Sequence, residues 1–358
     1  VRLLVPRYGA EDDETGVVRL PGRPVPLDPE DRLVSWRAMH SAATREAADC
    51  DIVHIQTPFV AHYAGLAAAR KHRRPVVLSY HTLFEAYLHH YAPFLPGGML
   101  RAAARRFSRA QCNAVDTVIV PSTAMRARLA DYGVRAHMEV LPTGIPLSAF
   151  AHADGARFRA RNGIPAGCRM LLFVGRVAHE KNIGFLLDVA RSLRNQYDDI
   201  VLVIAGEGPA LPSLQGRCVQ LGLEGMVRFV GYLERSRDLP DCYAAAELCV
   251  FASRTETQGL VLLEAMAAGV PVVALAEMGT RDILEPARGA LIAPDSVTAF
   301  AACVGALLDD PQRRAAMSVA AREDAAHWSE TQMAARLARL YRRLGTDPRH
   351  ASPAPARA

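Results

Sequence analysis

The chain has 358 residues, of which 50% are hydrophobic and 22% are charged. This length is too great for one ordinary hydrophobic core and predicts about two domains, and the composition is typical of a globular rather than a fibrous or disordered protein. Lys and Arg outnumber Asp and Glu by only 42 to 37, so total charge alone indicates no class of partner.

The cysteines and the apolar segments indicate the compartment. Seven cysteines are scattered in odd number without a CxxC pair, which argues against a disulfide framework or a structural zinc site. No apolar run approaches the roughly 18 residues that a transmembrane helix needs. The longest candidate, residues 259–276, is interrupted by Glu264 and Pro271. We therefore expect a protein of the reducing cytoplasm.

Short apolar runs alternate with helical patterns along the first part of the chain, which predicts parallel βαβ units. Residues 9–31 form a polar, Pro- and Gly-rich connection after the first strand. The expected strands are Arg2–Val5, Ile52–Ile55, Val76–Tyr80, Thr117–Val120 and Met138–Leu141, and the expected helices are Leu33–Ala48, Phe59–Arg70, Leu100–Asn113 and Thr123–Tyr132.

A second alternation follows a break at Pro142–Pro146. Its expected strands are Met170–Val174, Ile200–Ala205, Val227–Val230, Leu248–Phe251 and Val272–Leu275, and its expected helices are Ile183–Asn195, Leu211–Leu221, Leu260–Ala268, Val297–Leu308, Pro311–Ala326 and Ser329–Arg343.

The two alternations predict an α/β protein with two doubly wound parallel sheets. We assign residues 1–145 and 146–328 to the two domains, residues 329–345 to a helix that packs back towards the first domain, and residues 346–358 to a disordered tail. Open α/β sheets bind ligands outside the carboxyl ends of their strands, so we expect the functional site at that edge.

Two carboxylates stand out between Ser253 and Pro271. Glu256 precedes the apolar helix that begins at Leu260, and Glu264 lies inside it. Free N–H groups and the positive end of the helix dipole favour an anion at such a helix start, and Gly259 lets a ligand approach closely. A buried carboxylate needs partners, so Glu264 faces either a ligand or a neighbouring Arg or backbone group.

Other strand ends carry residues suited to a ligand. Arg176 and Lys181 follow Gly175, near the start of the next helix, and form either a phosphate clamp or a solvated charge pair. Gly206 begins a tight turn, and Gly231 with Tyr232 either lines a flat ring pocket or forms an ordinary turn.

His81 follows a strand of the first half directly, as either a functional or a structural histidine. No HExxH or paired metal-ligand spacing occurs in the sequence, so we expect no metal and no cofactor.

These motifs occur in a set order: SYHT around His81, GR-x4-K at Arg176 and Lys181, the Gly206 turn, and E-x7-E at Glu256 and Glu264. In this order they resemble the retaining glycosyltransferases of family 4. That resemblance implies a GT-B fold, in which two Rossmann-like domains face each other across a cleft. It extends over residues 1–343.

The resemblance also implies roles for the residues that match. Arg176 and Lys181, after Gly175 and near Gly206, would bind the diphosphate of a nucleotide-sugar donor, and Glu264 would bind its ribose. Glu256 would contact the donor sugar together with the backbone N–H groups of Gln258, Gly259 and Leu260. His81 would lie near the sugar from the opposite domain, and Gly231 with Tyr232 would lie by the base.

The beginning of the sequence differs from the family pattern. Members usually start with a strand, a Gly-rich loop and a long helix before the segment that matches Val1–Pro6. We interpret this difference as a truncated first domain and expect it to affect the activity of the chain.

Residues 70–109 indicate the acceptor. They contain eight Lys or Arg and one acidic residue, Glu85, with Phe84, Tyr87, Tyr91 and Phe94 between them. Such a segment suits an anionic membrane surface. We therefore expect a hexose transferred from a UDP-sugar, or from GDP-mannose, to a lipid or lipid-linked acceptor by a peripheral membrane enzyme on the inner face of the plasma membrane.

Other functions remain open at this point. The acceptor is alternatively a soluble molecule or a polysaccharide, and the basic segment is alternatively an exposed helix with its aromatic residues in the core. An inverting transferase and a non-catalytic module for nucleotides or nucleic acid are further alternatives. No motif that reads RNA or DNA occurs, so no nucleic acid is expected.

Overall fold

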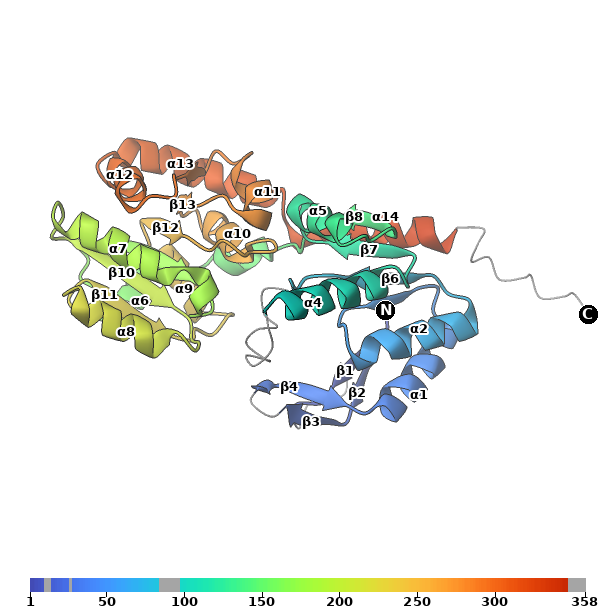
Figure 1. Ribbon diagram of the computed structural model, residues 1–358. Coiled ribbons are helices and arrows are strands. Elements are labelled where there is room, and N and C mark those ends of the chain that lie inside the picture. The colour runs from blue at the N-terminus through green and yellow to red at the C-terminus, as the bar shows by residue number, and fades with distance from the viewer. Residues whose placement is uncertain (10–13, 26–27, 84–96, 347–358) are drawn as a thin grey trace, which may run out of the picture. The chain divides into compact units, whose positions relative to one another are not determined.

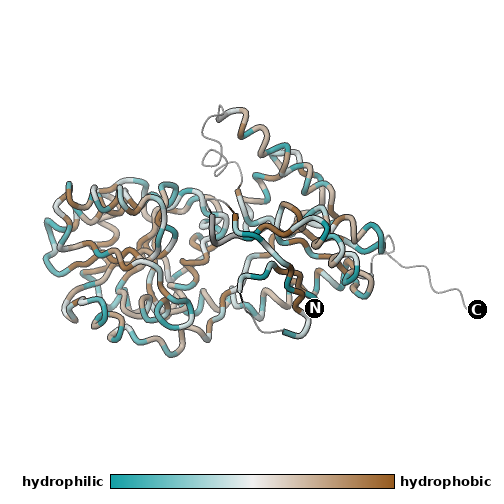
Figure 2. The backbone as a smooth tube through the Cα atoms, turned by 90° about the horizontal axis from the view of Figure 1, so that it is seen from below, coloured by the Kyte–Doolittle hydropathy of each residue, from teal (hydrophilic) through white to brown (hydrophobic). Residues whose placement is uncertain are grey.

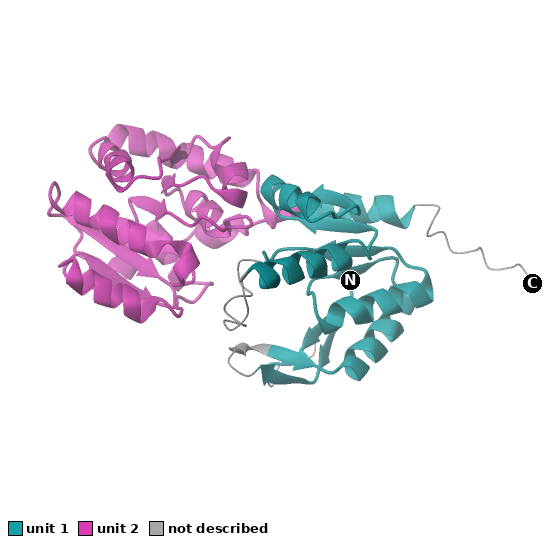
Figure 3. Ribbon diagram, in the orientation of Figure 1, with its two compact units in different colours: residues 1–141, 335–358 teal, residues 142–334 magenta. Residues whose placement is uncertain are grey.

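The computed structural model describes residues 1–9, 14–25, 28–83 and 97–346. The chain forms two compact units (Figure 3). Residues 1–141 together with 335–358 make unit 1, and residues 142–334 make unit 2. Figure 2 shows hydrophobic segments gathered inside each unit and hydrophilic segments around them.

Unit 2 is built on a six-stranded parallel sheet in the order β11-β10-β9-β12-β13-β14 (Figure 1). Its strands are β9 (Arg169–Val174), β10 (Ile200–Ala205), β11 (Val227–Gly231), β12 (Leu248–Phe251), β13 (Val272–Ala274) and β14 (Ala290–Ile292). The chain proceeds outwards from β9 to β11 and then returns to β12 on the other side of β9. This reversal places a topological switch point between β9 and β12, where doubly wound sheets bind ligands.

The helices of unit 2 cover this sheet, and α7 packs against both α8 and α12 while α10 packs against α13. They are α6 (Gly155–Arg161), α7 (Ile183–Arg194), α8 (Leu211–Gln220), α9 (Asp238–Ala244), α10 (Leu260–Ala267), α11 (Arg281–Leu284), α12 (Val297–Leu308) and α13 (Pro311–Ala326). All six residues of β10 are buried, as expected for a strand with both faces covered.

Unit 1 contains a four-stranded parallel sheet in the order β5-β6-β7-β8. Its strands are β5 (Val53–Ile55), β6 (Val76–Ser79), β7 (Thr117–Val120) and β8 (His137–Val140), and its helices are α1 (Trp36–Glu46), α2 (Val60–His72), α4 (Gly97–Cys112) and α5 (Thr123–Asp131). The last helix, α14 (Glu330–Gly345), packs Leu340 and Leu344 against Val77 and Ile119 of this sheet.

The first strands of unit 1 pair separately from that sheet. Strand β1 (Leu3–Pro6) pairs in parallel with β2 (Val17–Leu20), and β3 (Gly22–Val25) pairs antiparallel with β4 (Asp28–Val34). The fold is thus α/β with two parallel-sheet, Rossmann-like domains, as the sequence predicts.

Several expected element bounds are wrong. The connection predicted at residues 9–31 contains β2, β3 and the start of β4, and the helix expected from Leu33 begins at Trp36. Ser35 sets this start, since its hydroxyl accepts a hydrogen bond from the N–H of Ala38 at 3.2 Å. The short elements α6, α9 and β14 are absent from the prediction. The tail after Thr346 and the aromatic residues between 84 and 96 lie outside the described residues.

Candidate functional site

The carboxyl ends of β9 and β12 carry the charged residues predicted for the site. Gly175 and Arg176 follow β9 directly, and the loop from Ser253 to Gly259 connects β12 to α10. The Asn182 side chain joins the two loops, because its Nδ2 donates a hydrogen bond to the carbonyl of Ala252 at 3.2 Å. Residues far apart in the sequence therefore meet at the switch point.

Lys181 and Glu256 form an ion pair at this place. The Lys181 Nζ lies 2.5 Å from Glu256 Oε1, and both side chains are 15% exposed. The two residues come from different loops, so the pair fixes the end of β9's loop against the end of β12's loop. An incoming phosphate would meet a lysine that is already oriented and shared with a carboxylate.

Arg176, unlike Lys181, is not part of an ion pair among the described residues. Its side chain is exposed, and within the described ranges it has no hydrogen-bond or ion-pair partner. A planar arginine fork without a partner at the end of a central strand is free to bind an anion such as phosphate through two parallel hydrogen bonds.

Glycines allow the loops after β9 and β10 to touch. A Cβ on Gly206 would lie 2.0 Å from the carbonyl oxygen of Gly175, and φ at Gly206 is +135°. No side chain fits there, so Gly206 permits the approach of the two backbones. This packing role was not part of the prediction for Gly206.

The start of α10 offers open backbone donors. Gly259 has φ +96° and no side chain caps the helix. In the part of the chain that the structure describes, the N–H groups of Gln258, Gly259 and Leu260 have no acceptor. Open amides at a helix start, with the dipole behind them, favour an anionic or oxygen-rich ligand. The Gln258 side chain is committed elsewhere, to the backbone of Thr143.

Glu264 has two protein partners. Its Oε1 accepts from Arg235 Nη2 at 2.9 Å and its Oε2 from the Tyr243 hydroxyl at 2.9 Å. The residue is 6% exposed, and burial raises the pKa of its carboxyl while the bonds from Tyr243 and Arg235 lower it. The structure thus agrees with the interpretation in which Glu264 faces a neighbouring arginine. The Arg235 side chain is 72% exposed, however, so the bond on Oε1 is open to exchange with a ligand.

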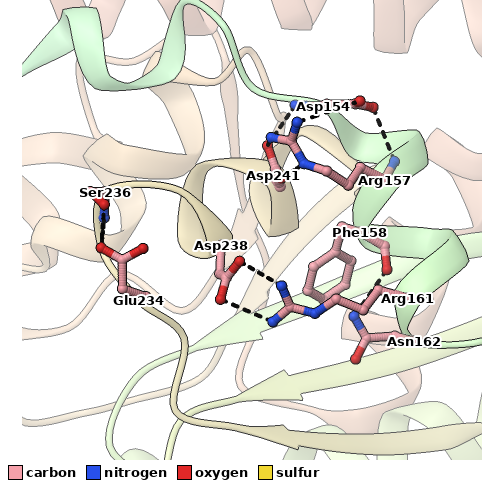
Figure 4. A network of polar contacts seen from close by, with 9 residues as sticks. All are labelled: Asp154, Arg157, Phe158, Arg161, Asn162, Glu234, Ser236, Asp238 and Asp241. Carbon is pink, nitrogen blue, oxygen red and sulfur yellow. Dashed lines mark hydrogen bonds and ion pairs between the residues drawn. The ribbon is translucent and has the colours of Figure 1, made fainter.

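Two short helices, α6 and α9, are joined by arginine–aspartate pairs (Figure 4), and α9 carries Tyr243. Arg157 of α6 forks onto the buried Asp241 of α9 with Nε and Nη2 at 2.6 and 2.8 Å, and Arg161 forks onto Asp238 at 2.7 and 2.9 Å. These bonds fix α9 against α6. Since Tyr243 lies on α9, they also fix the hydroxyl that orients Glu264.

Sequence reasoning missed Arg235 and Tyr243, and it gave no individual role to Ser253 or Thr255. The Ser253 side chain is completely buried, and among the described residues neither its hydroxyl nor that of Thr255 has a hydrogen-bond partner. Buried hydroxyls without a hydrogen-bond partner are rare in proteins. Two of them beside Glu256 suit a ligand that is rich in hydroxyl groups. The position of both residues after a buried strand was an available signal for them.

Gly231 and Tyr232 end β11. Gly231 has φ +72°, and the N–H of Tyr232 donates to Glu207 Oε1 at 3.4 Å. Tyr232 is 69% exposed, which is unusual for a large aromatic ring. The turn therefore presents an open aromatic face on the same edge of the sheet as Arg176.

His81 belongs to unit 1 and not to this group of residues. Its side chain is exposed, but surrounding residues of the same chain partly desolvate the ring, and this desolvation lowers the pKa of His81. Nearby, His54 contacts the Tyr341 hydroxyl at 2.5 Å through Nδ1 and the Ser79 hydroxyl at 2.8 Å through Nε2. Burial, then the charge of His81, lowers the pKa of His54 to about 4. His54 was not among the predicted residues.

The described ranges contain neither a cluster of metal ligands nor a membrane-spanning helix. In these ranges no three His, Cys, Asp or Glu side chains come close enough to hold a metal ion. Nor does any helix there have the length and apolar character that crossing a membrane requires.

Comparison with protein families gives two matches that together cover most of the chain. The model described as Glycosyltransferase Family 4 matches residues 1–149, and the one described as Glycosyl transferases group 1 matches residues 154–324. The boundary between these matches lies near the junction of the two units.

Curated relatives agree with the family models. The chain is 34% identical over 265 residues to an alpha-monoglucosyldiacylglycerol synthase of Streptococcus pneumoniae, with 72% of this chain and 59% of the relative covered. It is 33% identical over 341 residues to a D-inositol 3-phosphate glycosyltransferase of Kineococcus radiotolerans, with 87% and 77% covered. The chain thus spans less than two thirds of the first relative's length.

Solved structures share the fold. HepE of Anabaena in complex with UDP has a TM-score of 0.74 at 19% identity, covering 96% of this chain and 100% of that one. Sucrose-phosphate synthase of Thermosynechococcus elongatus has a TM-score of 0.77 at 24% identity, covering 96% and 87%. The sequence matches and the shared GT-B fold lead to one conclusion: the chain belongs to glycosyltransferase family 4.

Proposed function

We propose that the protein is a retaining glycosyltransferase that transfers a hexose from a nucleotide sugar to a lipid or lipid-linked acceptor. A UDP-sugar is the favoured donor, with GDP-mannose as the alternative. One observation carries the donor part of the proposal. Arg176, Lys181, Glu256 and the open amides at the start of α10 meet at the switch point of the sheet in unit 2.

The phosphates would bind to the two cations. Arg176 offers a free guanidinium, and Lys181 would be shared between Glu256 and the donor. Negative charge grows on the departing diphosphate as the sugar–phosphate bond breaks. Fixed cations and the dipole of α10 would stabilise this charge in the transition state more than in the ground state, which lowers the barrier.

The ribose and the sugar would bind on either side of these phosphates. Glu264 accepts hydrogen bonds, and a ribose hydroxyl would replace the exposed Arg235 on Oε1 while Tyr243 stays on Oε2. The sugar hydroxyls would contact Glu256 and the amides of Gln258, Gly259 and Leu260. Tyr232 would flank the base.

The transfer would retain the anomeric configuration through attack on the same face, with the leaving phosphate helping to deprotonate the acceptor hydroxyl. His81 would act near the donor sugar. We expect neither a metal nor another cofactor, because the cations and the helix start supply the positive charge.

Two observations favour a lipid acceptor. Helix α4 exposes Arg101, Arg105, Arg106 and Arg109, with Met99 58% exposed at its start. Among the relatives are enzymes named for diacylglycerol and phosphatidylinositol substrates. The basic helix would bind an anionic leaflet, at about 1 kcal/mol per basic residue near the surface. The protein would then act as a peripheral enzyme on the cytoplasmic face.

Calorimetric titration with UDP-glucose and GDP-mannose tests the donor site. One of these donors should bind the wild-type protein, and Arg176→Ala should weaken binding by about tenfold to a hundredfold, the effect of a lost charged hydrogen bond. Arg254→Ala is the matched control, because Arg254 lies in the neighbouring loop and pairs with Asp295 on the surface. Equal losses in both variants would contradict the assignment.

Co-sedimentation with vesicles tests the membrane surface. The double variant Arg101→Gln/Arg106→Gln should lose most of its binding to anionic vesicles, whereas Arg228→Gln/Arg313→Gln, with two exposed arginines of unit 2, should keep it. Negligible binding of the wild-type protein to anionic and neutral vesicles alike would favour a soluble or polysaccharide acceptor. A protein that binds nucleotides and transfers no sugar would be a non-catalytic nucleotide-binding module.

A further inference from the structure

The Gln258 side chain ties the loop before α10 to the segment where the chain enters unit 2. Its Oε1 accepts a hydrogen bond from the N–H of Thr143 at 2.9 Å, and its Nε2 donates to the carbonyl of Thr143 at 2.8 Å. Gln258 is 5% exposed but Thr143 is exposed, so both bonds are partly buried. An amide side chain is suited to this task, because it offers one donor and one acceptor to a single peptide unit.

The segment that contains Thr143 also contacts the second crossing between the units. Ile145 donates its N–H to the carbonyl of Trp328 at 2.9 Å, and its own carbonyl accepts from the N–H of Glu330 at 3.0 Å. A Cβ on Gly144 would lie 2.5 Å from the Cα of Glu330. The two stretches of chain that lead between the units are therefore bonded to each other inside unit 2.

Gln258 thus has two sides. Its backbone N–H is one of the open donors at the start of α10. Its side chain holds Thr143, two residues after Leu141, where the first segment of unit 1 ends. A ligand on the open amides restricts the backbone of Gln258. The restriction passes to Thr143 through the two side-chain hydrogen bonds and from there to both crossing segments.

We propose that Gln258 is a positioning residue that couples occupancy of the donor site to the crossing segments at residues 142–146 and 328–330. This inference rests on the proposed donor site. It adds that the side chain of Gln258 acts on the connection between the units, while the contact with the donor is made by the backbone. The coupling requires one residue whose backbone N–H is open to the donor and whose side chain is bonded to a crossing segment, and Gln258 combines the two.

Hydrogen exchange with and without UDP tests the coupling in the full chain. In the wild-type protein, saturating UDP should slow exchange of the amides of Thr143, Gly144 and Ile145, the N–H groups within residues 142–146. In Gln258→Leu the Kd for UDP should stay within about threefold, since the backbone donors remain, but the slowing at 142–146 should vanish. The kcat for sugar transfer should fall by about tenfold or more, with little change in the KM for the donor.

Gln258→Glu keeps the side-chain volume and the oxygen that accepts from the N–H of Thr143, but it removes the N–H group that donates to the Thr143 carbonyl. This variant should therefore also lose the UDP-dependent slowing of exchange, and it serves if the leucine variant does not fold. Gln332→Leu is the control, because Gln332 bonds the carbonyl of Ala326 beside the second crossing and has no bond to the loop before α10. Retained slowing at 142–146, or an unchanged kcat, in either Gln258 variant would overturn the inference. Absence of UDP binding to the wild-type protein would instead count against the proposed donor site.

Discussion

At the scale of single residues, the two carboxylates of the E-x7-E pattern have different surroundings. Glu256 is paired with Lys181 in a partly exposed position, whereas Glu264 is buried and bonded to Tyr243 and Arg235. The sequence places Glu256 before the helix and Glu264 inside it, and predicts that Glu264 needs a partner. It does not identify the partners, because Arg235 and Tyr243 lie on another loop and another helix and reach Glu264 only through the fold.

This difference predicts distinct effects of substitution. Glu264→Ala should weaken donor binding by about 1.5–3 kcal/mol, the range for hydrogen bonds to a charged group. Glu256→Ala should leave the donor Kd within about threefold and lower kcat by about a hundredfold, because its contact would matter as the sugar departs. Titration calorimetry and steady-state kinetics measure both parameters. Unchanged kinetics in both variants would contradict the site.

His62 gives a prediction that concerns stability. The residue is 1% exposed in α2, and in the described ranges neither ring nitrogen has a hydrogen-bond partner. Burial lowers its pKa from 6.5 to about 4. Between these values the unfolded chain binds a proton that the folded chain does not, so His62 makes stability fall as the pH drops from 6.5 to 4.

Substitution of His62 by leucine should remove this loss. Between pH 7 and pH 5 the free energy of unfolding of unit 1 should fall by about 2 kcal/mol less in His62→Leu than in the wild-type protein. Urea unfolding at the two pH values measures this, with the exposed His152→Leu as control. An equal fall in wild type and His62→Leu would show that His62 does not titrate in this way.

At the scale of elements, long segments are predictable and short ones are not. Helices α12 and α13 begin and end where the sequence places them. The start of α13 is marked by Asp310, which caps the helix, and by Pro311 at its first position. Helix α9 spans only Asp238–Ala244 and depends on the bonds from α6, so tertiary contacts decide it. The sequence predicts a turn at Gly206. The contact between Gly206 and Gly175 follows only from the pairing of β10 with β9, which the sequence does not give.

That contact gives a prediction with a matched control. Gly206→Ala places a Cβ 2.0 Å from the Gly175 carbonyl and should destabilise unit 2 by several kcal/mol and abolish donor binding. Gly216 lies in α8, where a Cβ meets no atom within 4 Å, and Gly216→Ala should stabilise the unit by about 0.5–1 kcal/mol. Thermal unfolding compares the two. Similar midpoints would refute the packing argument.

At the scale of the whole molecule, the described donor-site residues lie in unit 2, while His81 lies in unit 1. The sequence predicts the fold and the family, because the order of motifs and the alternation of elements extend along nearly the whole chain. The Gln258–Thr143 bonds were not predictable, since they join residues 115 positions apart through one side chain.

The division of roles between the units predicts the behaviour of His81. His81→Ala should leave UDP binding unchanged, because the residues proposed to contact the nucleotide lie in unit 2, and should lower kcat. Calorimetry with UDP and a transfer assay with the donor measure the two effects. A large loss of UDP affinity would show that His81 acts on the nucleotide.

The configuration of the product tests the central claim most directly. The purified protein would be incubated with an α-linked nucleotide sugar and vesicles that contain diacylglycerol, and the anomeric proton of the product would be examined by NMR. The account predicts an α-linked glycoside, as retention requires. A β-linked product would contradict it and indicate an inverting transferase, and the absence of sugar transfer from every UDP- and GDP-sugar would contradict the proposed activity itself.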